Sequence, residues 1–374
     1  MKKLLAILLA LVMVFALVSC GGGDKPATDD PTPEGGEEGG KTVYNVCNLV
    51  NGNLGDKSFF DSCEAGLAEL EAAGRITYDT LELGGTDADR PKWETTLNDV
   101  SSSGEYDFIV VGTWQMTDLL AAAAEKYPDQ QYIYYDNEVA GAPNICNIAY
   151  AQKDMGYLMG VFAAMMTSSD YEGMNAEKVV GFVGGGDQPV INDFLYGFLE
   201  GVKATDPEVK VDTRYTESFV DTALGKELGL SMINDSKADI VWGVAGSAGN
   251  GAAEAAVETG TWFLGVDSDQ ELTLPADQAA RTLTSGLKNI DKSLVWFFDE
   301  LDAGTSHVGE SVTLDLTNDG VGIVTDKNFA KAPQEVQDAV LKALADIQSG
   351  AIKVSTAIGD ESNGVATLRD SMKP

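Results

Sequence analysis

The stretch TVYNVCNLVNGNLGDKSFFDSCEAGLAELEAA, residues 42–73, decides the fold class of this chain. Its first part, Thr42 to Val50, is rich in apolar and β-branched residues and predicts a buried strand. From Lys57 to Ala73 apolar residues recur at helical spacing, at Phe60, Cys63, Leu67 and Leu70. A strand followed at once by a helix is the opening of an α/β unit.

The same alternation continues along the chain. After residue 73 we expect strands at 76–83, 108–111 and 131–136, with helices at 92–102 and 116–126. A second set predicts helices at 154–167, 190–204, 222–234 and 250–259, and strands at 179–183, 209–215, 240–245 and 262–266. Two successive sets of this kind predict two doubly wound parallel-sheet lobes.

The loops that follow the predicted strands are the candidate binding loops, because open parallel sheets bind ligands beyond the carboxyl ends of their strands. They cover residues 52–59, 112–114, 136–137, 184–187, 245–249 and 267–270. The glycine runs within 184–186 and 246–249 lack the spacing of phosphate-binding fingerprints, so we interpret them as sharp turns. Two lobes with facing loops predict one cleft between them.

The N-terminus has the pattern of a lipoprotein signal. Lys2 and Lys3 precede an apolar run, which ends in Leu17-Val18-Ser19-Cys20. We expect residues 1–19 to be a signal peptide, Cys20 to carry the lipid, and 20–41, rich in Gly, Pro and acidic residues, to be a disordered tether. The protein is then expected on the extracytoplasmic face of the cell membrane.

Composition excludes several classes of function. The formal net charge is -34, and it becomes -36 once Lys2 and Lys3 are removed, so nucleic acid is not an expected partner. His307 is the one histidine, which leaves little for a Ser-His-Asp triad or a multi-histidine metal site. Without Cys20, an odd set of three cysteines remains, and Cys47 and Cys63 are expected to be buried thiols. We expect no cofactor and no metal.

Five stretches, in order, resemble the basic membrane protein family of substrate-binding lipoproteins. They are DKSF (56–59), AQKDMGYLMGVFAA (151–164), FVGGGDQPVINDFLYGFLEG (182–201), GVDSDQ (265–270) and LTSGLKN (283–289). The resemblance implies a type I periplasmic-binding-protein fold, in which the chain crosses between lobes three times. We expect crossings near Asn147, at 272–280 and near Ala303, giving a first lobe of 42–148 plus about 281–303. The second lobe is then 149–280 plus about 304–374.

The resemblance also implies a purine clamped between two aromatic rings above a ribose held by carboxylates and a lysine. By motif, Phe59 and Phe194 would be the rings, Asp136 and Asp267 the carboxylates, and Lys288 the lysine. Stacking suits any base, since each has a π-face, and a carboxylate can accept from both hydroxyls of a diol. Three of these residues also have a simpler interpretation: Phe194 as core, Asp267 as a helix cap and Lys288 as a surface lysine.

Four further residues complete the candidate ligand-binding set: Asp56, Asp61, Trp114 and Gly246. Trp114 follows a strand and would floor the pocket. Asp61 stands where the family usually has asparagine, so it would either accept from a guanine base or complement the dipole of its own helix.

The function that the resemblance implies is capture without catalysis. The chain would be the monomeric binding subunit of an ABC importer, with permease and ATPase partners, and would take a purine nucleoside such as guanosine, inosine or adenosine. One alternative is a receptor for a sugar or signalling ligand. A less favoured one is a nucleoside hydrolase using Asp56, Asp61 and Asp267, which lacks the regular ligand run of a calcium site.

The lipid anchor gives a first testable prediction. Replacing the thiol in Cys20→Ser removes the only atom that the lipoprotein box offers for lipidation. The variant should therefore move from the detergent phase to the aqueous phase in a detergent-partition assay. A variant that stays with the detergent contradicts the anchor.

Overall fold

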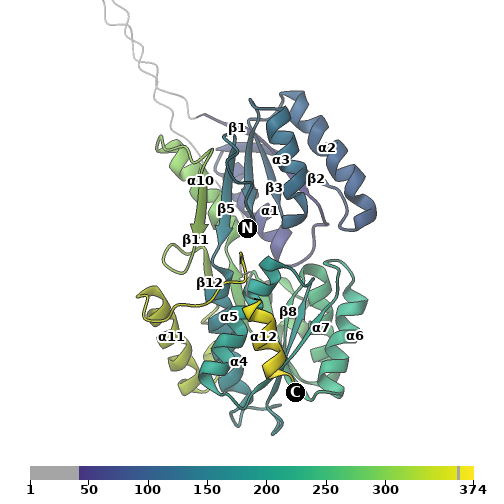
Figure 1. Ribbon diagram of the computed structural model, residues 1–374, viewed down its shortest axis with the longest axis vertical. Helices are drawn as coiled ribbons and strands as arrows, with labels where there is room; N and C mark the ends of the chain where they lie inside the picture. Colours follow the sequence, from purple (N-terminus) through teal and green to yellow (C-terminus); the bar gives the residue numbers. More distant parts are fainter. Residues whose placement is uncertain (1–41, 360–362) are drawn as a thin grey trace, which may run out of the picture. The chain divides into compact units, whose positions relative to one another are not determined.

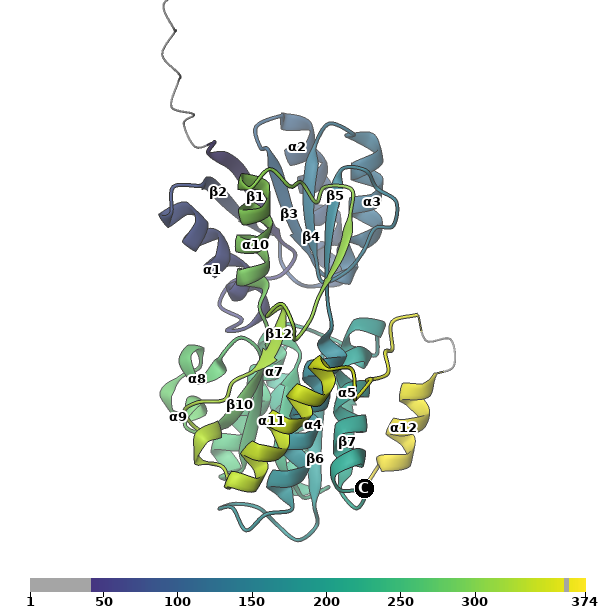
Figure 2. The ribbon, with the colours of Figure 1, turned by 90° about the vertical axis from the view of Figure 1, so that its left-hand side faces the viewer.

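The computed structural model describes residues 42–359 and 363–374. The expected signal peptide, tether and Cys20 lie outside the described residues. Within the described part, two six-stranded sheets form two lobes, each with helices on both faces (Figures 1 and 2). This confirms the predicted α/β class with two parallel-sheet lobes.

The first sheet has the order β11-β5-β4-β3-β1-β2, and all its pairings are parallel. Its strands are β1 (Tyr44–Val50), β2 (Ile76–Glu82), β3 (Phe108–Gly112), β4 (Gln131–Tyr135), β5 (Ile145–Tyr150) and β11 (Ser311–Leu314). Its helices are α1 (Phe59–Ala72), α2 (Arg90–Ser103), α3 (Thr117–Lys126) and α10 (Ile290–Asp302).

Successive residues of these strands face opposite sides of the sheet. Val46 and Val110 belong to the same apolar cluster as α1 and α10, whereas Cys47 and Ile109 belong to the cluster that α2 and α3 cover. Because both faces of the sheet are covered, the central strand β3 is a continuous apolar run, FIVVG, whereas the edge strand β2 is partly exposed.

The second sheet has the order β12-β10-β9-β8-β6-β7. Its strands are β6 (Val179–Gly184), β7 (Lys210–Tyr215), β8 (Ala238–Val244), β9 (Trp262–Asp267), β10 (Thr282–Lys288) and β12 (Val321–Ile323). Its principal helices are α4 (Gln152–Thr167), α5 (Pro189–Thr205), α6 (Thr222–Asn234) and α7 (Gly246–Thr259), with the short α8 (Gln270–Thr273) and α9 (Ala276–Ala279). The backbones of α4 and α5 pack closely because residue 197 is glycine: a Cβ there would clash with the carbonyl oxygen of Lys153, at 1.9 Å.

The expected division at residues 281 and 303–304 is corrected by the strand pairing. β10 was expected in the first lobe, but it pairs with β9 and β12 of the second sheet, and β11 joins the first sheet. The chain therefore changes sheets at Ala151, at Asn289 and within 315–320. The sequence TLTSGLK of β10 does not reveal which sheet the strand joins, because a strand buried on both faces needs the same kind of residues in either sheet.

The C-terminal segment packs on the second lobe, as expected. Helix α11 (Gln334–Gln348) lies against α4, and α12 (Gly364–Met372) lies against α5 (Figure 2). The thiols of Cys47, Cys63 and Cys146 are free and buried. In the part of the chain that the structure describes, none of the helices combines the length and hydrophobicity of a bilayer span.

Candidate functional site

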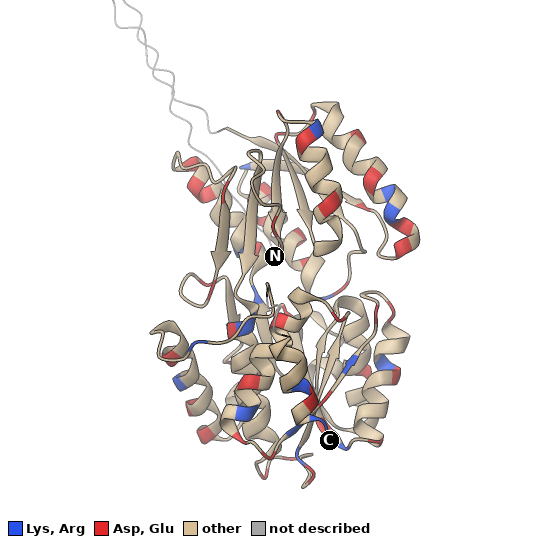
Figure 3. Ribbon diagram, viewed as in Figure 1, with Lys and Arg blue, Asp and Glu red and all other residues tan. Residues whose placement is uncertain are grey.

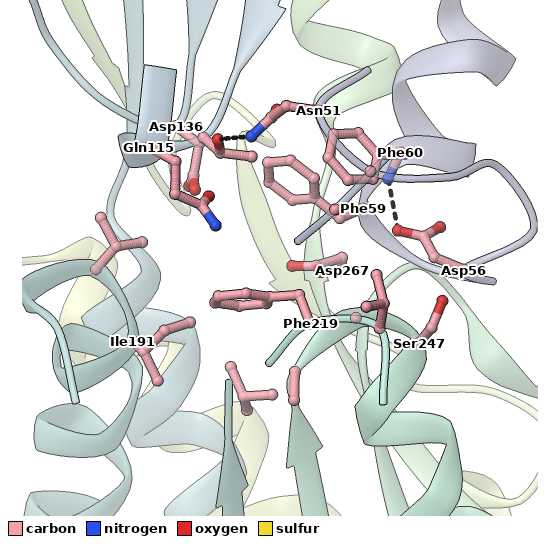
Figure 4. Close-up of a pocket in the computed structure, with 18 of the residues that line it drawn as sticks. Asn51, Asp56, Phe59, Phe60, Gln115, Asp136, Ile191, Phe219, Ser247 and Asp267 are labelled. Atoms are coloured by element: carbon pink, nitrogen blue, oxygen red, sulfur yellow. Dashed lines mark hydrogen bonds between the residues drawn. The ribbon is translucent and has the colours of Figure 1, made fainter. Parts of the chain in front are cut away.

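A cavity lies between the two lobes, at the carboxyl ends of strands from both sheets (Figure 4). The space within its lining is about 740 Å³, part of which is open to solvent. The first lobe contributes the ends of β1, β3 and β4, and the second contributes those of β8, β9 and β10. Five of the six loops expected to form the cleft contribute lining residues, and the loop 184–187 contributes none.

The floor of the cavity carries a buried charge cluster. Lys288, at the end of β10, is 1% exposed and forms an ion pair with Asp136, which directly follows β4. Asp267, the last residue of β9, also lines the cavity and is 7% exposed. Its Oδ1 atom has no hydrogen-bond partner among the described residues. A buried carboxylate oxygen without a donor is costly, so this atom is suited to accept from a ligand.

Burial dominates the protonation of this cluster. Loss of solvation raises the pKa of Asp267 to about 7, although Lys288 opposes the rise, and the neighbouring Asp136 and Asp56 add to it. Burial also raises the pKa of Asp136, against the attraction of Lys288. One lysine thus faces several carboxylates, and the pocket favours donors and disfavours further negative charge.

Asp56 and Asp61 shape the loop that leads into α1. The carboxylate of Asp56 accepts from the backbone N–H groups of Ser58, Phe60 and Asp61 at 2.9–3.1 Å. Burial raises the pKa of Asp56 to about 6, and these three hydrogen bonds oppose the rise. Asp61 accepts from the N–H groups of Gly55 and Lys57 at 2.7 and 3.0 Å. It is not among the described residues that line the cavity, so the expectation that it reads the base is corrected.

Two aromatic rings, Phe59 and Phe219, face each other across the cavity (Figure 4), and the expected Phe194 lines the cavity as well. Phe59 begins α1 in the first lobe, and Phe219 lies in the loop between β7 and α6 in the second. Gly185 makes room for Phe219, since a Cβ there would lie 2.2 Å from its ring. Phe60 packs in the same way against Gly52, which leaves Phe59 free to face the cleft.

Phe194 lines the cavity from α5 and lies against the buried charge cluster. It is 2% exposed and packs edge-on against Trp242 at 6.1 Å between centroids. The Lys288 ammonium is 4.5 Å from the centroid of Phe194 and 5.8 Å from that of Phe59. Phe194 is therefore placed to stabilise the buried lysine by a cation–π contact. The helical spacing of α5 could not reveal this, because most of that helix is buried.

Backbone strain concentrates at the same strand ends. Thr113, Asp136 and Asp267 have φ values of 69°, 73° and 63°, in the left-handed region that residues other than glycine rarely adopt. Such conformations cost about 1–3 kcal/mol each and gather at functional sites. The neighbouring Trp114 is 37% exposed at the rim, and Gly246, with φ 54°, lines the cavity beside Phe219.

Sequence reasoning missed Phe219 and Asn51. Asn51 is 3% exposed and donates to Thr113 Oγ1 at 2.7 Å, while its Oδ1 atom has no partner among the described residues. A signal for Asn51 existed, since it directly follows the first predicted strand. Phe219 is an isolated aromatic residue in the polar run TESFVD, and only the glycine at 185 hints at the ring that it accommodates.

The buried carboxylate of Asp267 predicts how stability depends on pH. An acid whose pKa is raised by folding binds an extra proton in the native state, so its stabilising contribution is present below about pH 4 and is lost as the pH rises to about 7. Asp267→Asn should therefore be more stable than the wild type at pH 8, by roughly 2–4 kcal/mol at about 1.4 kcal/mol per pKa unit. The gain should shrink between pH 7 and pH 4 in urea unfolding, and the exposed Asp129→Asn should show none. A constant difference from pH 4 to pH 8 contradicts the assignment.

The chain is similar to proteins of known family. A family model described as "ABC transporter substrate-binding protein PnrA-like" matches residues 43–355. The ABC transporter nucleoside-binding protein BmpA of Lactococcus lactis subsp. cremoris (strain MG1363) is 27% identical over 368 residues, which are 94% of this chain and 99% of that protein. Basic membrane protein D of Borreliella burgdorferi (strain JD1) is 27% identical over 327 residues, 85% of this chain and 89% of that protein.

Among solved structures, a solute-binding protein of an ABC transporter system from Aeropyrum pernix K1 superposes with a TM-score of 0.73 at 24% identity, covering 88% of this chain and 98% of that chain. This likeness shows the type I periplasmic-binding-protein fold. The relatives are substrate-binding proteins rather than enzymes, and ABC solute-binding proteins act outside the cytoplasm. Because the family model matches well over half of the chain, this protein belongs to the Bmp family of ABC transporter substrate-binding proteins.

Proposed function

We propose that this protein captures purine nucleosides for an ABC importer, as a lipoprotein anchored at Cys20 to the outer face of the cell membrane. The observation that carries the ligand proposal is the unpaired Oδ1 of Asp267 at the floor of a cleft walled by two aromatic rings. A relative named as nucleoside-binding supports the same class of ligand.

The rings of Phe59 and Phe219 suit a planar base. They come from different lobes, so a flat ligand between them would contact both halves of the protein. Stacking of a base on an aromatic side chain is worth ~1–3 kcal/mol and tolerates different bases. We therefore assign the base, rather than the sugar, to the space between these rings.

The charge cluster suits a ribose. Asp136 and Asp267 offer carboxylate oxygens beside Lys288, and the adjacent hydroxyls of a ribose are suitable donors. Lys288 can in turn donate to a hydroxyl or ring oxygen. The cluster also disfavours a phosphate, because an added charge ~4 Å from a carboxylate costs ~4 kcal/mol at an effective dielectric of ~20.

A calorimetric series tests this proposal. Guanosine, inosine or adenosine should bind, 2′-deoxyguanosine should bind less tightly than guanosine because one buried acceptor loses its donor, and guanosine 5′-monophosphate should bind least. Ribose and galactose serve as controls for a sugar receptor. Equal affinity for guanosine and its monophosphate would remove the assignment of Asp136, Asp267 and Lys288.

Phenylalanine variants test the aromatic pair. Phe59→Ala and Phe219→Ala should each weaken nucleoside binding by ~1–3 kcal/mol, with a small effect on thermal unfolding because both side chains are only partly buried. Phe194→Ala should instead lower the unfolding temperature, since it opens a cavity in the core beside Trp242. If Phe219→Ala binds nucleoside as tightly as the wild type, that ring does not touch the base.

A further inference from the structure

Three successive carbonyl groups of the first lobe accept hydrogen bonds from side chains of the second lobe. They belong to Asp56, Lys57 and Ser58, in the loop just before α1. Asn250 Nδ2 donates to the Asp56 oxygen at 2.9 Å, and Ser268 Oγ donates to the Ser58 oxygen at 3.0 Å. The Lys57 oxygen accepts from Thr273 Oγ1 at 2.8 Å and from Gln270 Nε2 at 3.3 Å. We call these four donors and three carbonyls the interlobe latch.

The donors are held in place on the second lobe. Gln270 is 1% exposed; its Oε1 accepts from the N–H of Val266 at 3.1 Å, and its own N–H donates to Ser285 Oγ at 3.1 Å. Its Nε2 also donates to Asn250 Oδ1 at 3.1 Å. The donors thus form a set tied to β9 and β10, the two strands that end in Asp267 and Lys288.

The acceptors are held in place on the first lobe. The Asp56 and Asp61 carboxylates accept five backbone N–H bonds from this loop and the start of α1. Lys57 has a φ of 62°, a strained conformation that these bonds maintain. Phe59 directly follows this loop, after Ser58. The loop is therefore a rigid acceptor whose position also fixes one ring of the cleft.

We propose that Asn250, Ser268, Gln270 and Thr273 are positioning residues that set ligand affinity by holding the two lobes closed. None of the four is among the described residues that line the cavity, so they act through Phe59 and Asp267 rather than by touching a ligand. Since the bonds join protein to protein, they favour the closed arrangement whatever the cleft contains. Losing them should speed ligand release and leave the initial encounter unchanged.

The test is a hydroxyl-deletion pair. In Ser268→Ala/Thr273→Val, two latch donors are lost with little change of side-chain volume, and dissociation of nucleoside should become about tenfold faster, as expected for two lost hydrogen bonds. The association rate should change less than about twofold. The hydroxyl-keeping pair Ser268→Thr/Thr273→Ser should restore slow release in the same stopped-flow measurement.

The matched control is Thr259→Val/Ser349→Ala. Both hydroxyls donate to carbonyls within the second lobe, of Ala255 at 2.8 Å and of Asp346 at 3.1 Å, so their loss should change neither rate. Dissociation that stays at the wild-type rate in the deletion pair, or that the hydroxyl-keeping pair fails to restore, overturns the latch.

The inference of the latch rests in part on the proposed function, because the first test measures release of a nucleoside. Small-angle scattering without ligand tests the latch independently of the proposed function. Without added ligand, the deletion pair should have a larger radius of gyration than the wild type and the control pair, because its lobes open more often. If the wild type binds none of the nucleosides, the proposed function fails and scattering alone decides the latch. An equal radius of gyration in all variants then overturns it.

Discussion

The ammonium group of Lys288 is the charge around which the cleft is organised. It is almost fully removed from water, and a buried cation is tolerated only when it is paired or otherwise stabilised. Asp136 pairs with it, and Phe194 and Tyr150 place their rings 4.5 and 5.5 Å from it. These partners come from both lobes, Asp136 and Tyr150 from the first and Phe194 from the second, so the lysine stabilises the same arrangement that brings the cleft together.

In that arrangement one buried carboxylate oxygen of the cluster has no hydrogen-bond partner among the described residues. Asp267 is held beside the Lys288–Asp136 pair by a strained backbone, and its Oδ1 remains unpaired. The protein thus maintains strain, a raised carboxylate pKa and an unsatisfied acceptor at a single place, each of which lowers stability. Such costs are expected where function requires them. Many other acidic residues lie on the helices of both lobes, where those that are exposed are screened by solvent (Figure 3).

The sequence was sufficient to predict the repeating strand and helix pattern, because buried parallel strands and amphipathic helices have distinct spacings. Most of the residues that it placed at one cavity follow parallel strands, which share an edge, and the structure brings together Asp56, Phe59, Trp114, Asp136, Phe194, Gly246, Asp267 and Lys288. It could not assign β10 to a sheet, because pairing depends on long-range contacts. Phe219 was not found, because a glycine distant in the sequence makes room for its ring.

The central claim is that the cleft recognises a base and a diol together. Native mass spectrometry of the protein mixed with equal amounts of guanosine, inosine, adenosine, ribose and galactose tests it directly. The account predicts one added mass per chain, equal to that of a nucleoside, and its loss in the Asp267→Asn variant. An added mass equal to that of a free sugar, or a nucleoside retained equally by Asp267→Asn, would contradict the account.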